Sequence, residues 1–414
     1  MIAEVVAVGS ELTSGQKLDT NSQWLARRLG ELGVEVRFHT ALDDDLSRNV
    51  DALRIATGRA RIVVVSGGLG PTQDDLTREA LATLANVPLI EDIGSLRAIE
   101  AMFARRNRPM LPRNRVQALL PEGAQALPNR VGTAPGIDMR LGENRLFALP
   151  GVPSELKIMF DEQLAPILTA LTGRGRVCVH RVINLFGKGE SEIESEAFDL
   201  TARGRRPEVG ITASDATISF RVSCDGDTEA AALAEIEPTV QLIYNRFGDL
   251  IVGEGDSDVA QALAIELKRQ NATLATAESC TGGMIAARLT DIPGISAHFL
   301  GGVVSYSNEA KSAFLGVPAD LIAARGAVSA EVAEAMAKGA RERFGSTLAI
   351  SVTGIAGPDG GSAEKPVGLV YLGLATADRV EHKRLLIGSE QPRDVIRSRA
   401  AKHALNWART TLSS

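Results

Sequence analysis

Apolar β-branched runs alternate with capped helical segments through the first third of the chain, and this alternation most constrains its fold. The expected strands cover residues 2–8, 34–40 and 62–65, and the expected helices cover residues 20–32 and 44–57. Such alternation is typical of a parallel, doubly wound α/β sheet. Because ligands bind these sheets at the carboxyl ends of the strands, the residues after each strand are candidates for a site.

The third of these strands leads into a glycine-rich turn, residues 66–70, and then into the acidic pair Asp74 and Asp75. Glycines between a strand and a helix favour a phosphate-binding turn, whose candidate contacts are Gly67, Gly68 and Gly70. The spacing is neither a Walker loop nor a dinucleotide fingerprint. The two carboxylates could hold a divalent metal against a pyrophosphate, or they could simply complement a helix dipole. The residues alone predict a metal-assisted site for a phosphorylated ligand.

A small hydroxyl lies where a buried strand turns into a helix in Ala277-Glu278-Ser279-Cys280-Thr281-Gly282-Gly283. The glycines allow backbone N–H groups to approach a ligand, and the helix N-terminus favours negative charge. Ser279 therefore suits a nucleophile with an oxyanion hole beside it, and the plain alternative is a serine that caps the helix. Cys280 is a second candidate nucleophile, although no histidine lies near it in the sequence.

Two downstream segments supply partners for this serine. Residues 301–306 read as a strand, and residues 307–311 as the capped start of a helix. A lysine beside a desolvated serine can act as general base, so Lys311 could do so with Tyr306 steadying the proton, unless the two form an ordinary surface pair. A further strand, residues 347–352, ends at Thr353-Gly354 in a loop with N–H and hydroxyl donors for a phosphate.

AESCTGG, GGVVSYSNEAK and SVTGIAGPDGG occur in this order and resemble the C-terminal domain of the CinA family, the nicotinamide mononucleotide deamidases. The resemblance covers residues 256–414. It implies hydrolysis of nicotinamide mononucleotide to nicotinic acid mononucleotide and ammonia, without a cofactor. It also implies Ser279 as nucleophile, Lys311 as base and Tyr306 as helper, with Arg393 on the nucleotide phosphate. The predicted substrate-binding residues of this domain are Thr281, Gly282, Gly283, Thr353, Gly354 and Arg393.

SGGLGPTQDDLTREA resembles the motif of the molybdopterin-binding, MoaB/MogA-like fold, with Asp74 where those proteins usually carry a basic residue. Together with Asn129 and the GTAPG and LPGVPSE segments, it resembles the CinA N-terminal domain, over residues 1–170. This resemblance implies cleavage of ADP-ribose to AMP and ribose 5-phosphate with a divalent metal. The implied site residues are Gly67, Gly68, Gly70 and Asn129 for the substrate, and Asp75 and Asp74 for the metal.

The third module, residues 174–253, has the pattern of a small α+β connector. Its expected order is β-α-β-β-α, with the first helix over residues 190–201, and it is similar to the KH-type connector of full-length CinA proteins. Acidic residues outnumber basic ones here, and neither a G-x-x-G loop nor an aromatic platform occurs. We therefore expect a structural role for the connector and no RNA binding.

The composition argues against nucleic-acid and membrane partners. The chain carries 51 acidic and 45 basic residues, for a net charge of −6. Its sequence contains neither a basic leader nor an apolar run of about 20 residues, the length that crosses a bilayer. The three cysteines lie far apart, which favours a reducing compartment. We expect a cytoplasmic homodimer.

The two resemblances together imply a bifunctional enzyme of pyridine nucleotide salvage. Three alternatives remain at this stage. The protein could be a regulator linked to competence or DNA damage that senses nucleotides, and its N-terminal domain could be a molybdopterin-type ligand binder without pyrophosphatase activity. The C-terminal domain could also be an amidase with another substrate.

Overall fold

The computed structural model describes residues 1–173 and 177–413, which fold into two compact units. The first comprises Met1–Val179 and Cys224–Glu235, and the second comprises His180–Ser223 and Ile236–Ser414. The start predicted for the connector, residue 174, and the end predicted for the C-terminal domain, residue 414, lie outside the described residues.

The first unit contains a six-stranded sheet in the order β2-β1-β3-β8-β7-β6. Its strands are β1 (Ile2–Val8), β2 (Glu35–Leu42), β3 (Ile62–Ser66), β6 (Gln125–Leu127), β7 (Gly136–Leu141) and β8 (Asn144–Leu149). The first four strands in this order are parallel, as predicted, whereas β7 and β6 pair antiparallel. The edge differs because only Gly142 and Glu143 join β7 to β8, and a parallel pair needs a long crossover.

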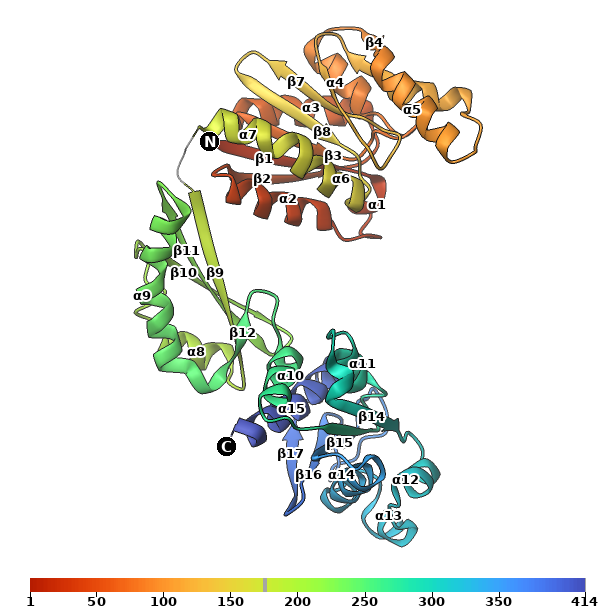
Figure 1. Ribbon diagram of the computed structural model, residues 1–414, viewed down its shortest axis with the longest axis vertical. Coiled ribbons are helices and arrows are strands. Elements are labelled where there is room, and N and C mark those ends of the chain that lie inside the picture. The colour runs from red at the N-terminus through yellow and green to blue at the C-terminus, as the bar shows by residue number, and fades with distance from the viewer. Residues whose placement is uncertain (174–176, 414) are drawn as a thin grey trace. The chain divides into compact units, whose positions relative to one another are not determined.

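Helices cover both faces of this sheet (Figure 1). They are α1 (Ser10–Thr13), α2 (Thr20–Glu31), α3 (Leu46–Arg59), α4 (Thr77–Ala85), α5 (Ile93–Arg105), α6 (Pro153–Met159) and α7 (Ala165–Thr172). Along β3, Val63 and Val65 pack in one apolar cluster with α3 and α4, and Ile62 and Val64 pack in the other with α2, α6 and α7. A strand buried on both faces is continuously apolar, which is why β3 was recognisable from sequence. A small antiparallel pair, β4 (Leu89–Glu91) and β5 (Leu119–Pro121), flanks α5 along the chain.

The connector forms a four-stranded sheet in the order β10-β11-β9-β12. Its elements are β9 (Val177–Phe186), α8 (Glu190–Glu196), β10 (Glu208–Ser214), β11 (Thr217–Gly226), α9 (Glu229–Phe247) and β12 (Ile251–Glu254). The order is the predicted one with β12 added. Helix α8 ends before the predicted residue 201, because the chain tightens into turns there, with the amide of Leu200 donating to the carbonyl of Ala197 at 2.8 Å.

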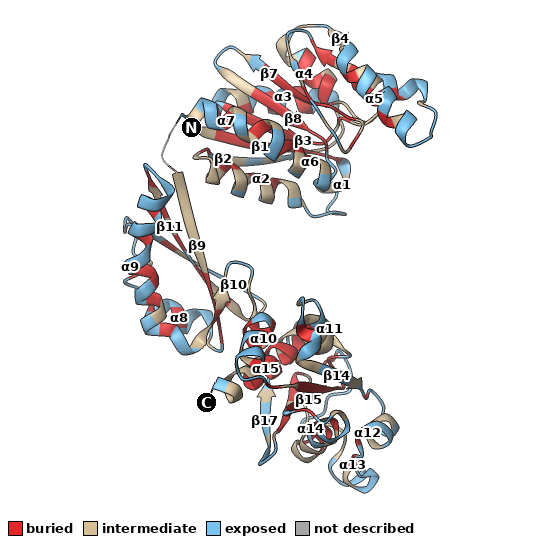
Figure 2. Ribbon diagram, in the orientation of Figure 1, coloured by how far each residue is buried: buried red, intermediate tan, exposed pale blue. Residues whose placement is uncertain are grey.

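The C-terminal domain is built on a five-stranded sheet in the order β14-β13-β15-β16-β17. Its strands are β13 (Leu274–Glu278), β14 (Phe299–Val304), β15 (Leu348–Gly354), β16 (Leu369–Ala375) and β17 (Val380–Leu386). The first three in the order are parallel, and β16 and β17 are antiparallel. Strands β13 and β15 are almost wholly buried (Figure 2), so their carboxyl ends meet inside the domain.

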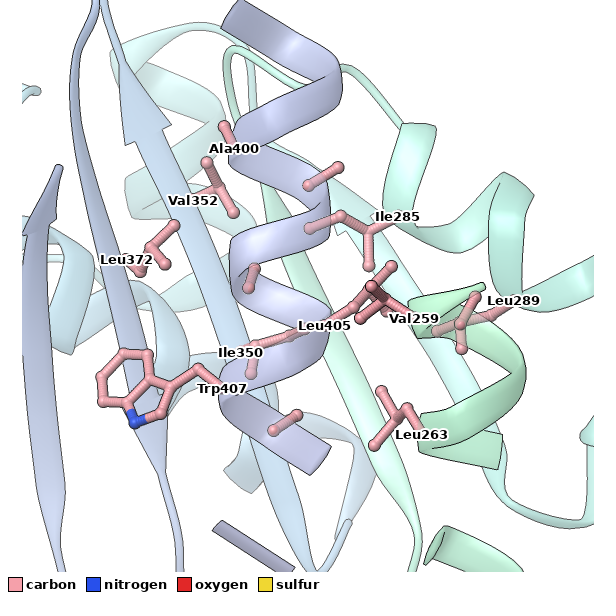
Figure 3. Packing of buried hydrophobic residues seen from close by; sticks show 14 of the residues in the cluster. Val259, Leu263, Ile285, Leu289, Ile350, Val352, Leu372, Ala400, Leu405 and Trp407 are labelled. Carbon is pink, nitrogen blue, oxygen red and sulfur yellow. The ribbon is translucent and has the colours of Figure 1, made fainter. Parts of the chain in front are cut away.

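Helices α10 to α15 pack on both faces of the sheet. They are α10 (Val259–Arg269), α11 (Met284–Thr290), α12 (Asn308–Leu315), α13 (Ala319–Arg325), α14 (Ala330–Phe344) and α15 (Arg393–Ser413), with a 3₁₀ turn at Ile295–Ala297. Figure 3 shows α15 with Ala400 and Leu405 between the strand residues Ile350 and Val352 and the side chain of Ile285 from α11. Helices α12, α13 and α14 share a second apolar cluster with β13 and β15. Across the described residues, no helix is long and apolar enough to span a bilayer.

Candidate active site

The turn after β13 presents Ser279 at the carboxyl end of the sheet. The amide of Ser279 donates to the carbonyl of Val352 on β15 at 2.9 Å, which fixes the start of the turn. Gly282 and Gly283 have φ of 62° and 91°, in the left-handed region that favours glycine. The chain can therefore reverse direction into α11 within a few residues of the serine.

Ser279 does not cap α11. The carboxylate of Glu278 accepts hydrogen bonds from the amides of Ile285 at 3.1 Å and Ala286 at 2.9 Å. This buried side chain therefore satisfies the first turn of the helix, and negative charge there is favourable. The structure leaves the serine hydroxyl for other partners, which excludes the helix-cap alternative.

The hydroxyl of Ser279 is hydrogen-bonded to the amine of Lys311. Nζ of Lys311 donates to Oγ of Ser279 at 3.1 Å and to the carbonyl of Ser305 at 2.9 Å. The lysine, on α12, is only 1% exposed, and burial lowers its pKa. Among the residues that the structure describes, Lys311 has no ion pair to hold its charge. A serine hydroxyl beside a lysine with a depressed pKa has the arrangement that a nucleophile and its base require.

Cys280 is the weaker candidate for the nucleophile. It belongs to the apolar cluster beneath α15, and it is 5% exposed. Burial raises the pKa of its thiol to about 12. Because the thiolate is the reactive form, this cysteine stays protonated and inert at neutral pH.

Tyr306 lies at the rim of the site and pairs with Arg393 rather than with the lysine. Its side chain is 63% exposed, and its hydroxyl accepts a hydrogen bond from Nη2 of Arg393 at 3.0 Å. Nη1 of Arg393 donates to the carbonyl of Gly357 at 2.5 Å. The tyrosine hydroxyl has no hydrogen bond to Ser279 or Lys311 among the described side chains. The structure thus places Tyr306 with the predicted phosphate contact.

The other predicted contacts lie in the walls of the site. The hydroxyl of Thr353, on β15 and 1% exposed, donates to the carbonyl of Ala327 at 2.8 Å. The hydroxyl of Thr281 is buried and has no partner among the described residues. Gly354 ends β15, where a Cβ would lie 2.7 Å from the side chain of Val370, so its backbone is closely confined.

Arg397 is a site residue whose role the sequence did not reveal. Its Nε donates to the carbonyl of Cys280 at 3.0 Å, and its Nη2 donates to the carbonyl of Thr281 at 2.8 Å. Arg397, on α15, therefore holds the backbone of residues 279–283, the turn that carries the candidate nucleophile and is called the nucleophile turn below. The signal that could have found it is spacing, because Arg397 follows Arg393 by one helical turn and residues four apart share a helix face.

In the first unit, the glycine turn after β3 is firmly organised. Gly67 and Gly68 have φ of 108° and 66°, and a Cβ on Gly67 would lie 2.3 Å from the carbonyl oxygen of Val8. The hydroxyl of Thr77 donates to the carbonyl of Gly67 at 2.8 Å. The buried guanidinium of Arg78 donates to the carbonyls of Leu69 at 2.8 Å and Gly70 at 2.7 Å. Only glycine fits this close approach of two strand ends.

Of the two predicted metal ligands, Asp75 is engaged by its own loop. Its carboxylate accepts from the amide of Gly70 at 2.7 Å, from the amide of Thr72 at 2.9 Å, and from the hydroxyl of Thr72. Asp74 is exposed, and a hydrogen bond from Thr72 lowers the pKa of its carboxyl. In the described ranges, no three His, Cys, Asp or Glu side chains gather as a metal centre. Asp74 is the more exposed acid of the pair.

Asn129 also supports its own loop. Its amide nitrogen donates to the carbonyl of Ala134 at 2.9 Å and to the carboxylate of Glu155 at 2.8 Å, and its oxygen accepts from the amides of Val131 and Gly132. A cavity of about 410 Å³ adjoins this loop, between it and α5. Asn129 therefore shapes the wall of that cavity.

Three family models match the chain in sequence order. The model described as probable molybdopterin binding domain matches residues 4–170, the damage-inducible protein CinA KH domain matches residues 180–253, and the CinA C-terminal domain matches residues 256–412. A competence-damage inducible protein of Symbiobacterium thermophilum is 43% identical over 100% of this chain and 99% of its own. A CinA-like protein of Dictyoglomus thermophilum is 40% identical over 100% and 99%. A crystal structure of a competence/damage inducible protein from Agrobacterium tumefaciens, 41% identical, covers 38% of this chain and 94% of its own, with a TM-score of 0.36.

Proposed function

The chain belongs to the CinA family, and on that premise we propose that its C-terminal domain hydrolyses nicotinamide mononucleotide to nicotinic acid mononucleotide and ammonia. The observation that carries the proposal is the 3.1 Å contact between the hydroxyl of Ser279 and the amine of Lys311. A protein that only sensed nucleotides would not need a nucleophile–base pair. The regulatory alternative is therefore the weaker one.

In the proposed reaction, the oxygen of Ser279 attacks the amide carbon while the neutral amine of Lys311 takes the hydroxyl proton. The C–N bond then breaks, and the lysine ammonium returns the proton to the leaving nitrogen, so that ammonia departs. Water hydrolyses the resulting ester with the same base. The carbonyl of Ser305, which accepts a hydrogen bond from Nζ, keeps the amine aimed at the serine through these steps.

The oxyanion of this reaction needs backbone donors other than the amide of Ser279, which is bonded to Val352. Within the described part of the chain, the turn amides of Thr281 and Gly283 have no hydrogen-bond acceptor. They are therefore available for the developing negative charge. Arg393 at the start of α15 suits the nucleotide phosphate, with Tyr306 holding its guanidinium in place.

Ammonia release from nicotinamide mononucleotide by the purified chain tests this function. Ser279→Ala should abolish release, whereas Ser296→Ala, an exposed serine of the same domain, should not change it. Binding of the nucleotide, measured as a thermal shift, should survive the Ser279→Ala change. Release at the wild-type rate by Ser279→Ala would rule out the serine mechanism. Turnover of a different amide with none of the mononucleotide would favour the amidase alternative.

For the N-terminal domain, we propose cleavage of the pyrophosphate bond of ADP-ribose, giving AMP and ribose 5-phosphate, because its glycine turn lies between a strand and a helix, a position that favours phosphate binding. A divalent cation would offset charge on the pyrophosphate, and Asp74 is the residue that fits its binding. The competing proposal is a molybdopterin-type ligand binder, supported by the family model for residues 4–170. Formation of AMP from ADP-ribose with Mg²⁺ or Mn²⁺ separates the two. A cytoplasmic homodimer without nucleic-acid or membrane partners remains our proposal for the whole chain.

A further inference from the structure

The turn between β10 and β11 in the connector has an unusual backbone. Asp215 and Ala216, its two central residues, have φ of 48° and 60°. Two-residue hairpins that need positive φ at both positions favour Asn-Gly, because a Cβ is disfavoured there. An alanine in such a position offers no side-chain hydrogen bond in return. A conformation of this kind persists where surrounding contacts hold it, so the contacts of this turn are informative.

The tip of this hairpin is held by α15 of the C-terminal domain, within the same compact unit. The carboxylate of Asp215 accepts from Oγ of Ser398 at 2.5 Å and lies 3.0 Å from Nζ of Lys402. The carbonyl of Asp215 accepts from the same amine at 2.7 Å. Ala216 packs against the main apolar cluster of the domain. Lys402 is only 7% exposed, so the hairpin supplies the partners of a buried charge.

The same carboxylate reaches a second helix. Nη2 of Arg288 on α11 donates to Oγ of Ser398 at 2.6 Å and lies 3.7 Å from the carboxylate of Asp215. Helix α11 begins directly after the nucleophile turn, at Met284. Asp215 therefore links α15 to α11, the helix that follows the nucleophile turn.

Helix α15 also carries Arg397, which donates hydrogen bonds to the nucleophile turn. Arg397 is the neighbour of Ser398 and donates to the carbonyls of Cys280 and Thr281, at 3.0 and 2.8 Å. A Cβ on Gly282 would lie 3.3 Å from its guanidinium, so the arginine is packed directly on the glycine turn. The path from Asp215 to the nucleophile thus passes through one helix and one side chain.

We propose that the connector hairpin, through Asp215, is part of the support of the serine nucleophile: it positions α15 and α11 so that Arg397 holds the turn in its reactive geometry. Asp215 and Arg397 are positioning residues in this view, since neither touches the scissile amide. The kinetic consequence of this inference rests on the proposed deamidase activity. The structural part, that the hairpin orders the turn, is independent of that activity.

The kinetic test compares Asp215→Asn with Glu208→Gln, an exposed acid at the start of β10, in the full-length chain. Small misplacements of a reacting group are costly, so we expect Asp215→Asn to lower kcat for ammonia release about 10-fold with little change in KM. Glu208→Gln should match the wild type. Arg397→Ala should also lower kcat, and the double variant should lose less than the product of the two losses, because both act on one turn. Independent, multiplicative losses would contradict a path through Arg397.

Hydrogen–deuterium exchange tests the structural part without any substrate. Amides of residues 279–286 should exchange several-fold faster in Asp215→Asn, while those of residues 348–352 in β15 keep their wild-type rate. Ser398→Ala removes the hydroxyl that joins Asp215 to Arg288, and it should act in the same direction if Asp215→Asn folds poorly. Unchanged exchange at the turn in both variants would overturn the proposal. A wild-type chain that releases no ammonia would instead overturn the deamidase, and the exchange result would still decide the role of the hairpin.

Discussion

At the scale of single residues, the hydrogen bonds of the groups around Ser279 determine which partner its hydroxyl has. Glu278 satisfies the helix start, and the backbone amide of Ser279 is bonded to Val352, so the hydroxyl of Ser279 is left with Lys311. Burial does the rest, because it depresses the pKa of the amine of Lys311 and raises the pKa of the thiol of Cys280. The same burial therefore favours the neutral amine of Lys311 and the protonated thiol of Cys280.

The first prediction concerns the pH dependence of ammonia release. Because burial lowers the pKa of Lys311, kcat/KM should rise with pH through a value below about 10.4, the ordinary lysine pKa. Lys311→Met should lower kcat/KM by about 10³-fold or more, and Lys338→Met, an exposed lysine on α14, should leave it unchanged. A pH-independent rate over pH 6–10 would argue against a lysine base.

Protein stability gives a second readout of the same lysine. The unfolded chain binds this proton more tightly than the folded one, so the contribution of Lys311 to stability falls as pH drops from about 10.4 to the folded pKa. Lys311→Met removes the free-energy cost of burying the charged amine. We therefore expect the variant to unfold at an equal or higher temperature than the wild type at pH 7, measured by calorimetry. A clear loss of Tm at pH 7 would mean that Lys311 is not strained by burial.

The second prediction separates the two adjacent aspartates. Asp75 accepts three hydrogen bonds from its own loop, so Asp75→Asn should destabilise the first unit by about 1–3 kcal/mol with or without metal. Asp74→Asn should leave the free energy of unfolding within about 0.5 kcal/mol of the wild type, as exposed substitutions do, and should raise the Mg²⁺ concentration needed for AMP formation. Metal-independent cleavage that Asp74→Asn does not affect would remove the cation from the proposal.

At the scale of elements, the strands that carry the sites were predictable and their surroundings were not. β3, β13 and β15 are buried, and each contains an apolar run that allowed the strand to be placed from sequence together with the glycines that follow. The end of β15 was placed too early, because Thr353 and Gly354 continue the strand beyond its apolar residues. The contact of Tyr306 with Arg393 joins residues 87 positions apart, and local patterns carry no information on such pairs. The contact of the β10–β11 hairpin with α15 could not be predicted from the sequence for the same reason.

The third prediction tests the element that presents the nucleophile. Glu278 is buried, and its carboxylate holds two amides at the start of α11. Glu278→Gln replaces one acceptor oxygen with a donor and removes a charge that the helix dipole favours, so it should cost about 1–3 kcal/mol of stability. Glu309→Gln, at the exposed start of α12, is the matched control. Chemical denaturation followed by circular dichroism measures both, and equal stabilities would mean that Glu278 does not order the helix.

At the scale of the whole molecule, the two candidate sites lie in different compact units and use different chemistry. The first unit holds the glycine turn after β3, the candidate phosphate contact, and the second holds the pair of Ser279 and Lys311. A serine–lysine pair needs no Lewis acid, whereas cleavage of a charged pyrophosphate benefits from a cation. The two activities should therefore respond to different substitutions and conditions.

The fourth prediction is that variants of the full-length chain lose the two activities separately. Gly67→Ala puts a Cβ 2.3 Å from the carbonyl oxygen of Val8 at a φ of 108°, so it should distort the glycine turn and stop AMP formation from ADP-ribose. Its rate of ammonia release should stay within about two-fold of the wild type, because Ser279 and Lys311 lie in the other unit, and variants at sites without shared partners act independently.

Ser279→Ala should behave in the opposite way, with AMP formation intact and ammonia release abolished, and an excess of chelator should mimic Gly67→Ala. Both products are measured in the same preparation, so a misfolded variant would reveal itself by losing both. Gly58→Ala, an exposed helical glycine of α3 with open space around it, controls for the added methyl group. If Gly67→Ala or the chelator stopped ammonia release as well, the sites would be coupled, and the description of two independent activities would be wrong.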